Sequence, residues 1–189
     1  MAEALRENYT QVIVLCEDRQ HWVFAYRFLT RNGVHGRRIR ARVSPSGQGS
    51  GEQYVREQYP VEVAEQRKRA ARLNSALIVI QDCDVTTLEG RRATLEQSAE
   101  REPNDRIALL FPKRNIETWI QFLTGGQAVN EVDSYPKLRG RESDCHDAAD
   151  GLAAKNEYRL SADVPPSLRA ACPEIRRIFP DKRCVEPAG

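Results

Sequence analysis

Carboxylates follow two apolar runs of the sequence, in positions suited to holding a divalent cation. Glu17 comes directly after QVIVLC (11–16). Asp82 and Asp84 follow ALIVIQ (76–81), with one residue between them. Magnesium prefers oxygen ligands and keeps several waters, so two or three carboxylates are enough to hold it. These residues predict a metal site for Mg²⁺ or Mn²⁺, and a metal of this kind serves phosphate chemistry by activating water and neutralising charge.

Each carboxylate taken alone has a simpler explanation. Charged residues often follow a buried strand because the chain re-enters water there, and Asp84 could start the turn before a helix cap. Several carboxylates grouped without a cation would raise one another's pKa, which a bound metal relieves. The combination of Glu17 with Asp82 and Asp84 therefore favours a metal site.

The elements that must position these carboxylates alternate between strands and helices. Strands are expected at 11–16, 37–43, 76–81 and 106–111; the runs at 11–16 and 76–81 are apolar on both sides and suit buried strands. Helices are expected at about 21–30, at about 52–73 with an interruption at Pro60, and after a cap at Thr86 or Thr87. This alternation predicts an α/β fold with a doubly wound, mostly parallel sheet. Sites in such folds form at the carboxyl ends of the strands, where the carboxylates lie.

The C-terminal third shows helical periodicity only. Ile116, Trp119, Ile120 and Leu123 would share one face of a short helix, and two more helices are plausible at about 143–155 and 166–179. We therefore expect an α/β domain at 1–112 and a helical extension at 113–189 that packs on the same domain.

Basic residues gather on the second expected strand, whose sequence RRIRARV alternates basic and apolar. One basic face is the consequence of a two-residue period. Contacts with the phosphate backbone of nucleic acid are expected from Arg37, Arg38, Arg40 and Arg42, and such binding weakens steeply with salt. The neighbouring loop SPSGQGSG (44–51) contains no phosphate-loop motif and is expected to be a flexible connection.

Composition narrows the function classes only a little. The 189 residues carry 29 basic and 27 acidic side chains, and the five cysteines form no CxxC pair. No apolar run reaches the length of about 18 residues that a membrane helix needs, and the first residues do not resemble a secretory signal. A cytoplasmic protein with no membrane partner is the expectation.

The order of these motifs resembles the Toprim domain of topoisomerases, DnaG-type primases and overcoming-lysogenisation-defect nucleases. In that family a Glu ends the first strand and a DxD motif ends the third. Glu17 in IVLCEDRQ matches the first feature, and Asp82 and Asp84 in LIVIQDCDV match the second. The resemblance covers about residues 10–112 and implies a Toprim-like fold in which these three carboxylates bind metal and take part in catalysis.

A second stretch, PKRNIETWIQFL (112–123), is similar to small stand-alone Toprim-like proteins, in which an E-x-W string follows the fourth strand. The related nucleases use a further carboxylate and a lysine, which implies Glu117 for the first and Lys113 or Lys137 for the second. Glu117 could equally be an acid favoured by the start of a helix. The sequence departs from the family at His21, where a further acidic ligand is expected; a histidine on the helix surface is the simpler interpretation, and a ligand the alternative.

The resemblance implies a small metal-dependent endonuclease acting on nucleic acid, with DNA as the expected substrate. A chain of 189 residues has no room for a topoisomerase gate, and no zinc-binding module of a primase is visible. Stand-alone relatives pair with an ATPase in bacterial defence against phage, so an ATPase partner is implied. Two alternatives stay open: a non-catalytic Toprim-fold module that docks on an ATPase, and a small phosphohydrolase acting on mononucleotides.

Overall fold

Four parallel strands form the central sheet, in the order β2-β1-β3-β4. The computed structural model describes residues 9–47, 49–125, 129–154, 157–159 and 163–185. The strands are β1 (Gln11–Cys16), β2 (Ile39–Val43), β3 (Ser75–Ile80) and β4 (Ile107–Leu110). All four lie within or next to the apolar runs of the sequence, and the predicted doubly wound α/β fold is confirmed.

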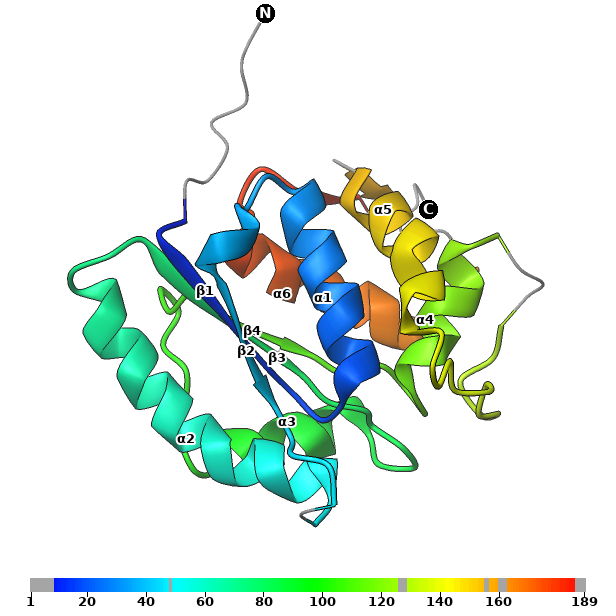
Figure 1. Cartoon of the computed structure of the whole chain (residues 1–189), viewed down its shortest axis with the longest axis horizontal. Helices are drawn as coiled ribbons and strands as arrows, with labels where there is room; N and C mark the ends of the chain where they lie inside the picture. Colours follow the sequence, from blue (N-terminus) through cyan, green and yellow to red (C-terminus); the bar gives the residue numbers. More distant parts are fainter. Residues whose placement is uncertain (1–8, 48, 126–128, 155–156, 160–162, 186–189) are drawn as a thin grey trace, which may run out of the picture.

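Helices cover both faces of this sheet (Figure 1). On one face lie α2 (Gly51–Ala70) and α3 (Leu88–Glu96). On the other lie α1 (Arg19–Arg31), α4 (Ile116–Leu123), α5 (His146–Ala154) and α6 (Pro166–Ile178). Side chains alternate across the sheet, so Val12 and Val14 belong to the α1 side of the core while Ile13 and Leu15 belong to the α2 side.

The described parts of 113–189 share the core of the sheet rather than forming one of their own. Trp119 of α4 is fully buried, and Ala148 of α5 and Leu168 of α6 lie in the same cluster as Val14 of β1. Trp119 Nε1 donates a hydrogen bond to Ser167 Oγ at 2.7 Å, which joins α4 to α6. The segment also contains elements that the sequence did not predict, namely the 3-10 helix η2 (Glu142–Cys145) and a parallel pair of short strands, β5 (Glu157–Arg159) and β6 (Arg183–Val185).

Helix α2 runs continuously through Pro60, so the predicted interruption is wrong. Proline inside a helix removes one backbone hydrogen bond. Val55, Tyr59 and Val63 flank Pro60 and are each 0–1% exposed against the sheet. Burial of this apolar stripe holds the helix together across the missing bond.

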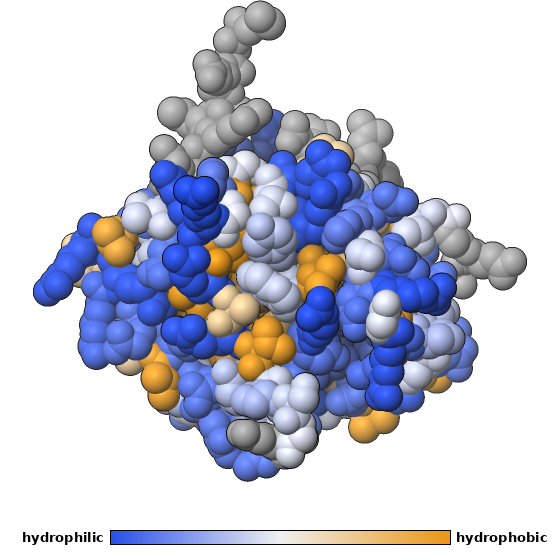
Figure 2. All heavy atoms as spheres, in the orientation of Figure 1, coloured by the Kyte–Doolittle hydropathy of each residue, from blue (hydrophilic) through white to orange (hydrophobic). Residues whose placement is uncertain are grey.

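The surface is polar over most of the face in view (Figure 2), where apolar residues form small patches between charged ones. The most exposed large hydrophobic residues, Val85 and Val132, stand far apart in the sequence. Among the helices of the described ranges, none has both the length and the apolar character that crossing a membrane demands.

Candidate metal centre

The carboxyl ends of β1 and β3 bring the predicted acidic residues together. These strands are direct neighbours, and Cys16 pairs with Ile80 at the end of the ladder. Glu17 and Asp82 therefore leave the sheet side by side. Burial raises the pKa of Glu17 to about 7, and the negative charges of Asp82 and Asp84 add to that increase. A carboxyl group in this state is poised to bind a cation or a proton.

His21 occupies the centre of this acidic group. Asp18 is the N-cap of α1, and its carboxylate accepts a hydrogen bond from the backbone N–H of His21 at 3.1 Å. The same oxygen lies 2.8 Å from His21 Nδ1, while His21 Nε2 lies 2.9 Å from Asp82 Oδ1. The imidazole is fully buried, so the interpretation of His21 as a surface histidine is wrong. The first turn of α1 starts directly after β1 and faces the end of β3.

The charge state of His21 follows from its two partners. Burial disfavours a charged ring, but the charges and hydrogen bonds of Asp82 and Asp18 raise the pKa of His21 well above its usual value. Since both ring nitrogens face carboxylate oxygens, each must carry a proton in this arrangement. Burial tends to raise the pKa of Asp18, but its hydrogen bond with His21 holds it well below the usual range.

Three side chains converge closely enough to hold a metal ion. One ligand atom each from Glu17, His21 and Asp82 lies within 4.8 Å of the others. Glu17 Oε1 is buried and has no hydrogen-bond partner within the described part of the chain. Two carboxylates and an imidazole form a donor set that fits a divalent cation, and the oxygen of Glu17 that lacks a partner is available to bind it.

Asp84 lies beside this group. Its backbone is in the left-handed region at φ 48° and bridges to Arg114, and the preceding residue, Cys83, donates its N–H to the Pro112 carbonyl. The Asp84 side chain is 63% exposed, 3.9 Å from Arg91 Nη2. In the part of the chain that the structure describes, Asp84 is not among the converging ligand atoms, although it was predicted with Glu17 and Asp82.

Glu117 and Lys137, from the C-terminal third, both reach the site. Glu117 is 3% exposed, and its Oε1 lacks a hydrogen-bond partner among the described residues. Burial, with help from the charge of Asp82, raises the pKa of Glu117. Lys137 Nζ lies 3.7 Å from Asp18 Oδ2. Lys113, the other lysine candidate, instead donates to the Thr86 carbonyl.

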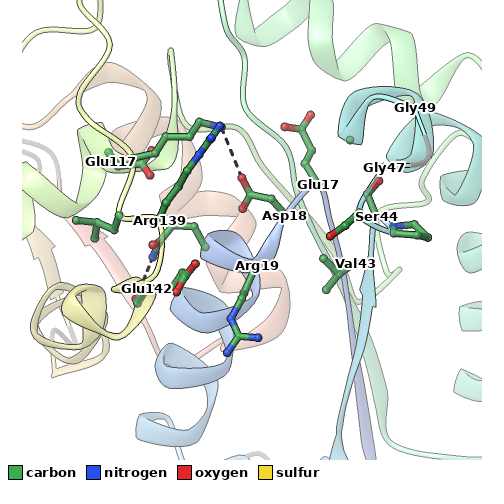
Figure 3. Close-up of a pocket in the computed structure, with 16 residues that line it drawn as sticks. Glu17, Asp18, Arg19, Val43, Ser44, Gly47, Gly49, Glu117, Arg139 and Glu142 are labelled. Carbon is green, nitrogen blue, oxygen red and sulfur yellow. Dashed lines mark hydrogen bonds and ion pairs between the residues drawn. The ribbon is translucent and has the colours of Figure 1, made fainter.

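A cavity of about 620 Å³ opens beside the acidic group (Figure 3). Glu17 and Asp18 lie between its two sides, one formed by Ser44, Gly47 and Gly49 and the other by Glu117, Arg139 and Glu142. The glycine-rich loop, expected to be a simple connection, thus forms one wall. The positive side chains that line the cavity are Arg19, Lys137 and Arg139.

Gly51, the first residue of α2, is closely packed against Glu17. A Cβ atom at Gly51 would lie 2.7 Å from Glu17 Cβ and 2.9 Å from the Glu17 carbonyl oxygen. Only glycine permits this approach, which brings the start of α2 to the cavity. Sequence reasoning missed Gly51, Asp18, Arg19 and Arg139. The available signal was Asp18, two residues after the end of the strand and three before His21, the spacing at which an N-cap side chain contacts its helix.

The arginines of the second strand are exposed but do not form one surface at the cavity. Arg37 and Arg38 lie at the amino end of β2, and Arg38 donates to the Tyr9 carbonyl at 2.9 Å. Arg40 donates to the Arg37 carbonyl at 2.7 Å. Arg42 lies next to Val43, which lines the cavity, and pairs with Glu62 of α2 at 2.9 Å. None of the four is among the described residues that line the cavity.

No family model, curated protein or solved structure matches this chain.

Proposed function

We propose that this protein is a metal-dependent nuclease of the Toprim type that hydrolyses phosphodiester bonds in nucleic acid, with DNA as its substrate. The observation that carries the proposal is the convergence of Glu17, His21 and Asp82 at adjacent strand ends, beside a large cavity with positive side chains. The resemblance of Glu17 and the Asp82-Cys83-Asp84 triplet to the Toprim motifs supports the same reaction.

The chain's own residues supply binding and charge control in this reaction. Glu17 and Asp82 would hold the cation, Mg²⁺ or Mn²⁺, and the neighbouring Asp84 would add a further negative charge. When bound, the cation activates water and neutralises charge on the phosphate. Lys137 and Arg139 line the cavity and would orient the phosphate backbone. Glu117 lines the cavity with Glu17, and its Oε1, which has no partner among the described residues, would be available to the substrate or the cation.

The lining of the cavity favours a polymer over a mononucleotide. Arg19, Lys137 and Arg139 lie among its lining residues, beside the acidic Glu17, Asp18, Glu117 and Glu142, whose charge a bound cation would offset. Contacts with several successive phosphates would result, with an affinity that falls as salt rises. An ATPase partner in a phage-defence complex is part of the proposal and rests on the sequence resemblance alone.

A plasmid-nicking assay with Mn²⁺ or Mg²⁺ tests this function. Wild type should nick, and Asp82→Asn should not. Asp150→Asn is a matched control, because Asp150 pairs with Arg27 and Arg31 on α1 rather than with the metal centre. Equal nicking by wild type and Asp82→Asn would refute the proposal. Hydrolysis of a generic phosphate ester without nicking would favour a phosphohydrolase instead.

One observation favours a non-catalytic module that docks on an ATPase. The direct contact of His21 Nε2 with Asp82 Oδ1 at 2.9 Å already neutralises part of the acidic group without a metal. If this contact is permanent, the site is a structural ion pair. A protein that binds no metal, nicks nothing and co-purifies with an ATPase would establish that second function.

A further inference from the structure

The surroundings of His21 match those of a metal-bound histidine. A ligating imidazole typically donates its second N–H to a carboxylate, which fixes the ring orientation and tautomer. Asp18 is such a carboxylate, 2.8 Å from Nδ1, and its N-cap contact with the His21 backbone at 3.1 Å holds it in place. Nε2 is left to face Asp82 and Glu17.

A second observation indicates that a cation belongs here. Glu117 is 3% exposed, lines the cavity with Glu17, and has an oxygen without a partner in the described ranges. The carboxyl groups of Glu17, Asp82 and Glu117 thus lie at one site with His21, and one oxygen each of Glu17 and Glu117 has no hydrogen-bond partner among the described residues. Grouping buried carboxylates in this way is unfavourable unless a positive ion compensates them.

The donor set then selects the ion. Mg²⁺ prefers oxygen ligands, whereas imidazole nitrogen strengthens binding of first-row transition ions, in an order that rises from Mn²⁺ to Co²⁺ and beyond. We propose that the cation displaces the Nε2 proton of His21 and takes Nε2 as a direct ligand, that Asp18 is the positioning residue of His21, and that the centre takes Mn²⁺ or a later first-row divalent ion in preference to Mg²⁺. This inference rests on the proposed function and specifies the cofactor of the same site.

Metal titrations on the folded protein test this directly. Calorimetry with MnCl₂ and MgCl₂ gives the affinity ratio, and the visible absorption of added Co²⁺ reports on a nitrogen ligand. Wild type should bind Mn²⁺ and Co²⁺ at least about tenfold more tightly than Mg²⁺. His21→Asn should bring the ratio close to one and change the Co²⁺ spectrum. The matched control is His35→Asn, since His35 is exposed and caps η1 (Gly36–Arg38) instead.

A second variant covers the case in which His21→Asn fails to fold. Asp18→Asn retains a good N-cap residue for α1 but replaces the carboxylate that orients the ring. Mn²⁺ affinity should fall by about 10- to 100-fold, the usual effect of losing such a partner. Unchanged Mn²⁺ affinity in Asp18→Asn, or an unchanged Co²⁺ spectrum in folded His21→Asn, would overturn the proposal.

These outcomes separate this inference from the proposed nuclease activity. A wild-type protein that nicks DNA and prefers Mg²⁺, with no effect of His21→Asn on the spectrum, would keep the function and reject the ligand. A protein with the predicted spectrum and ion preference that nicks nothing would keep the ligand and reject the nuclease.

Discussion

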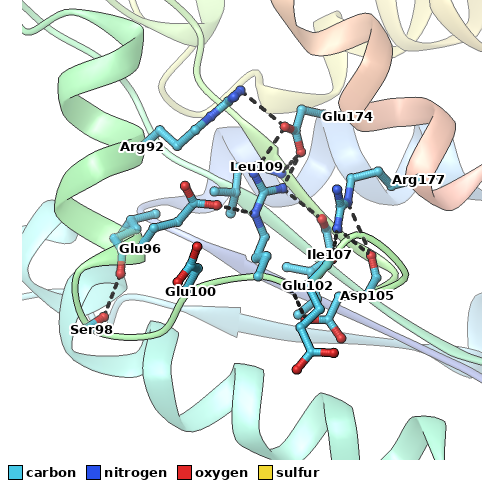
Figure 4. A network of polar contacts seen from close by, with 12 residues as sticks. Arg92, Glu96, Ser98, Glu100, Glu102, Asp105, Ile107, Leu109, Glu174 and Arg177 are labelled. Carbon is cyan, nitrogen blue, oxygen red and sulfur yellow. Dashed lines mark hydrogen bonds and ion pairs between the residues drawn. The ribbon is translucent and has the colours of Figure 1, made fainter.

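Two regions of this protein bury carboxylates, and they treat the negative charge in opposite ways. At the edge of β4, Glu174 of α6 accepts hydrogen bonds from Arg101 at 2.5 Å and from the Leu109 N–H at 2.9 Å, with Arg92 at 3.2 Å (Figure 4). At the metal centre, Glu17 and Glu117 each keep a buried oxygen without a partner within the described chain. Glu117 is as buried as Glu174, so the difference in hydrogen-bond pairing, rather than in burial, separates a carboxylate that stabilises the fold from one that could bind a ligand.

The Glu174 network also protects the sheet. Arg101 donates to the Ile107 carbonyl at 3.0 Å while Glu174 accepts from Leu109, so backbone groups of the edge strand β4 find side-chain partners. Edge strands with open backbone groups invite pairing with other chains.

The largest expected effect is on stability, from Glu174→Ala. The change removes one of the two carboxylates that pair with the buried Arg101, leaving Glu96 as the other, and it leaves the Leu109 N–H without its acceptor. Breaking a buried pair from one side costs up to about 3–5 kcal/mol. Urea denaturation followed by circular dichroism measures the free energy of unfolding. Mn²⁺ affinity should stay unchanged in the folded fraction. A loss below about 1 kcal/mol would contradict the structural role.

Glu17→Gln should have the opposite effect to Glu174→Ala: activity should be lost while stability is kept. Cleavage should fall by about 100- to 1,000-fold, the range for removing one group that stabilises charge in a transition state. Folding should be undisturbed, because the neutral amide removes a buried charge from a site where burial already raises the pKa of the carboxyl. Nicking rates and urea denaturation of the same sample measure the two effects. Full activity of Glu17→Gln would contradict the assignment of Glu17 to the metal site.

The pH dependence of stability sharpens the comparison further. Glu17 has a folded pKa of about 7 against an ordinary value of 4.5, so the native state retains a proton that the unfolded chain has lost. In chelator, the free energy of unfolding should therefore fall between about pH 4.5 and 7, by at most about 3 kcal/mol. The raised pKa of His21 adds a loss of the same sign above its usual range, as pH rises further.

The Glu17 contribution to this pH dependence can be isolated. The free energy of unfolding in EDTA should vary less with pH across this range for Glu17→Gln than for wild type. Curves that coincide for wild type and Glu17→Gln would show that Glu17 titrates normally.

Gly51→Ala should have the smallest effect of the four. The new Cβ would meet Glu17 Cβ at 2.7 Å, and so displace Glu17 or the start of α2. A small displacement at a catalytic group can cost about 100-fold, and we expect about tenfold because Glu17 can yield in part. Gly151→Ala in α5 is the control: its Cβ would meet the Leu123 carbonyl at 3.7 Å, an ordinary contact. Nicking rates that are equal in both variants would show that the close packing at Gly51 is unimportant.

The fold could be predicted from the sequence because its strands are short apolar runs with clear ends. The same runs placed Glu17 and Asp82 at one edge of the sheet, since parallel strands share the direction of their carboxyl ends. The path of the chain through Pro60 could not be predicted, because packing of Tyr59 and its neighbours on the sheet outweighs a missing hydrogen bond.

Only part of the candidate site could be predicted from the sequence. Helical periodicity does not show that the first turn of α1 faces the sheet edge, so His21 was assigned to the surface. Asp84 was grouped with Asp82 by spacing, but a left-handed backbone at Asp84 turns the two side chains apart. The role of the glycine loop depends on the tight approach of Gly51 to Glu17, a tertiary contact that composition cannot reveal.

The central claim is that Glu17 and Asp82, at the ends of β1 and β3, hold a metal ion together with His21. The most direct measurement is calorimetric titration of Mn²⁺ into wild type, Asp82→Asn and Glu174→Gln. We predict saturable binding by wild type and by Glu174→Gln, and no binding by folded Asp82→Asn. Absence of binding by wild type, or equal binding by all three proteins, would contradict the account.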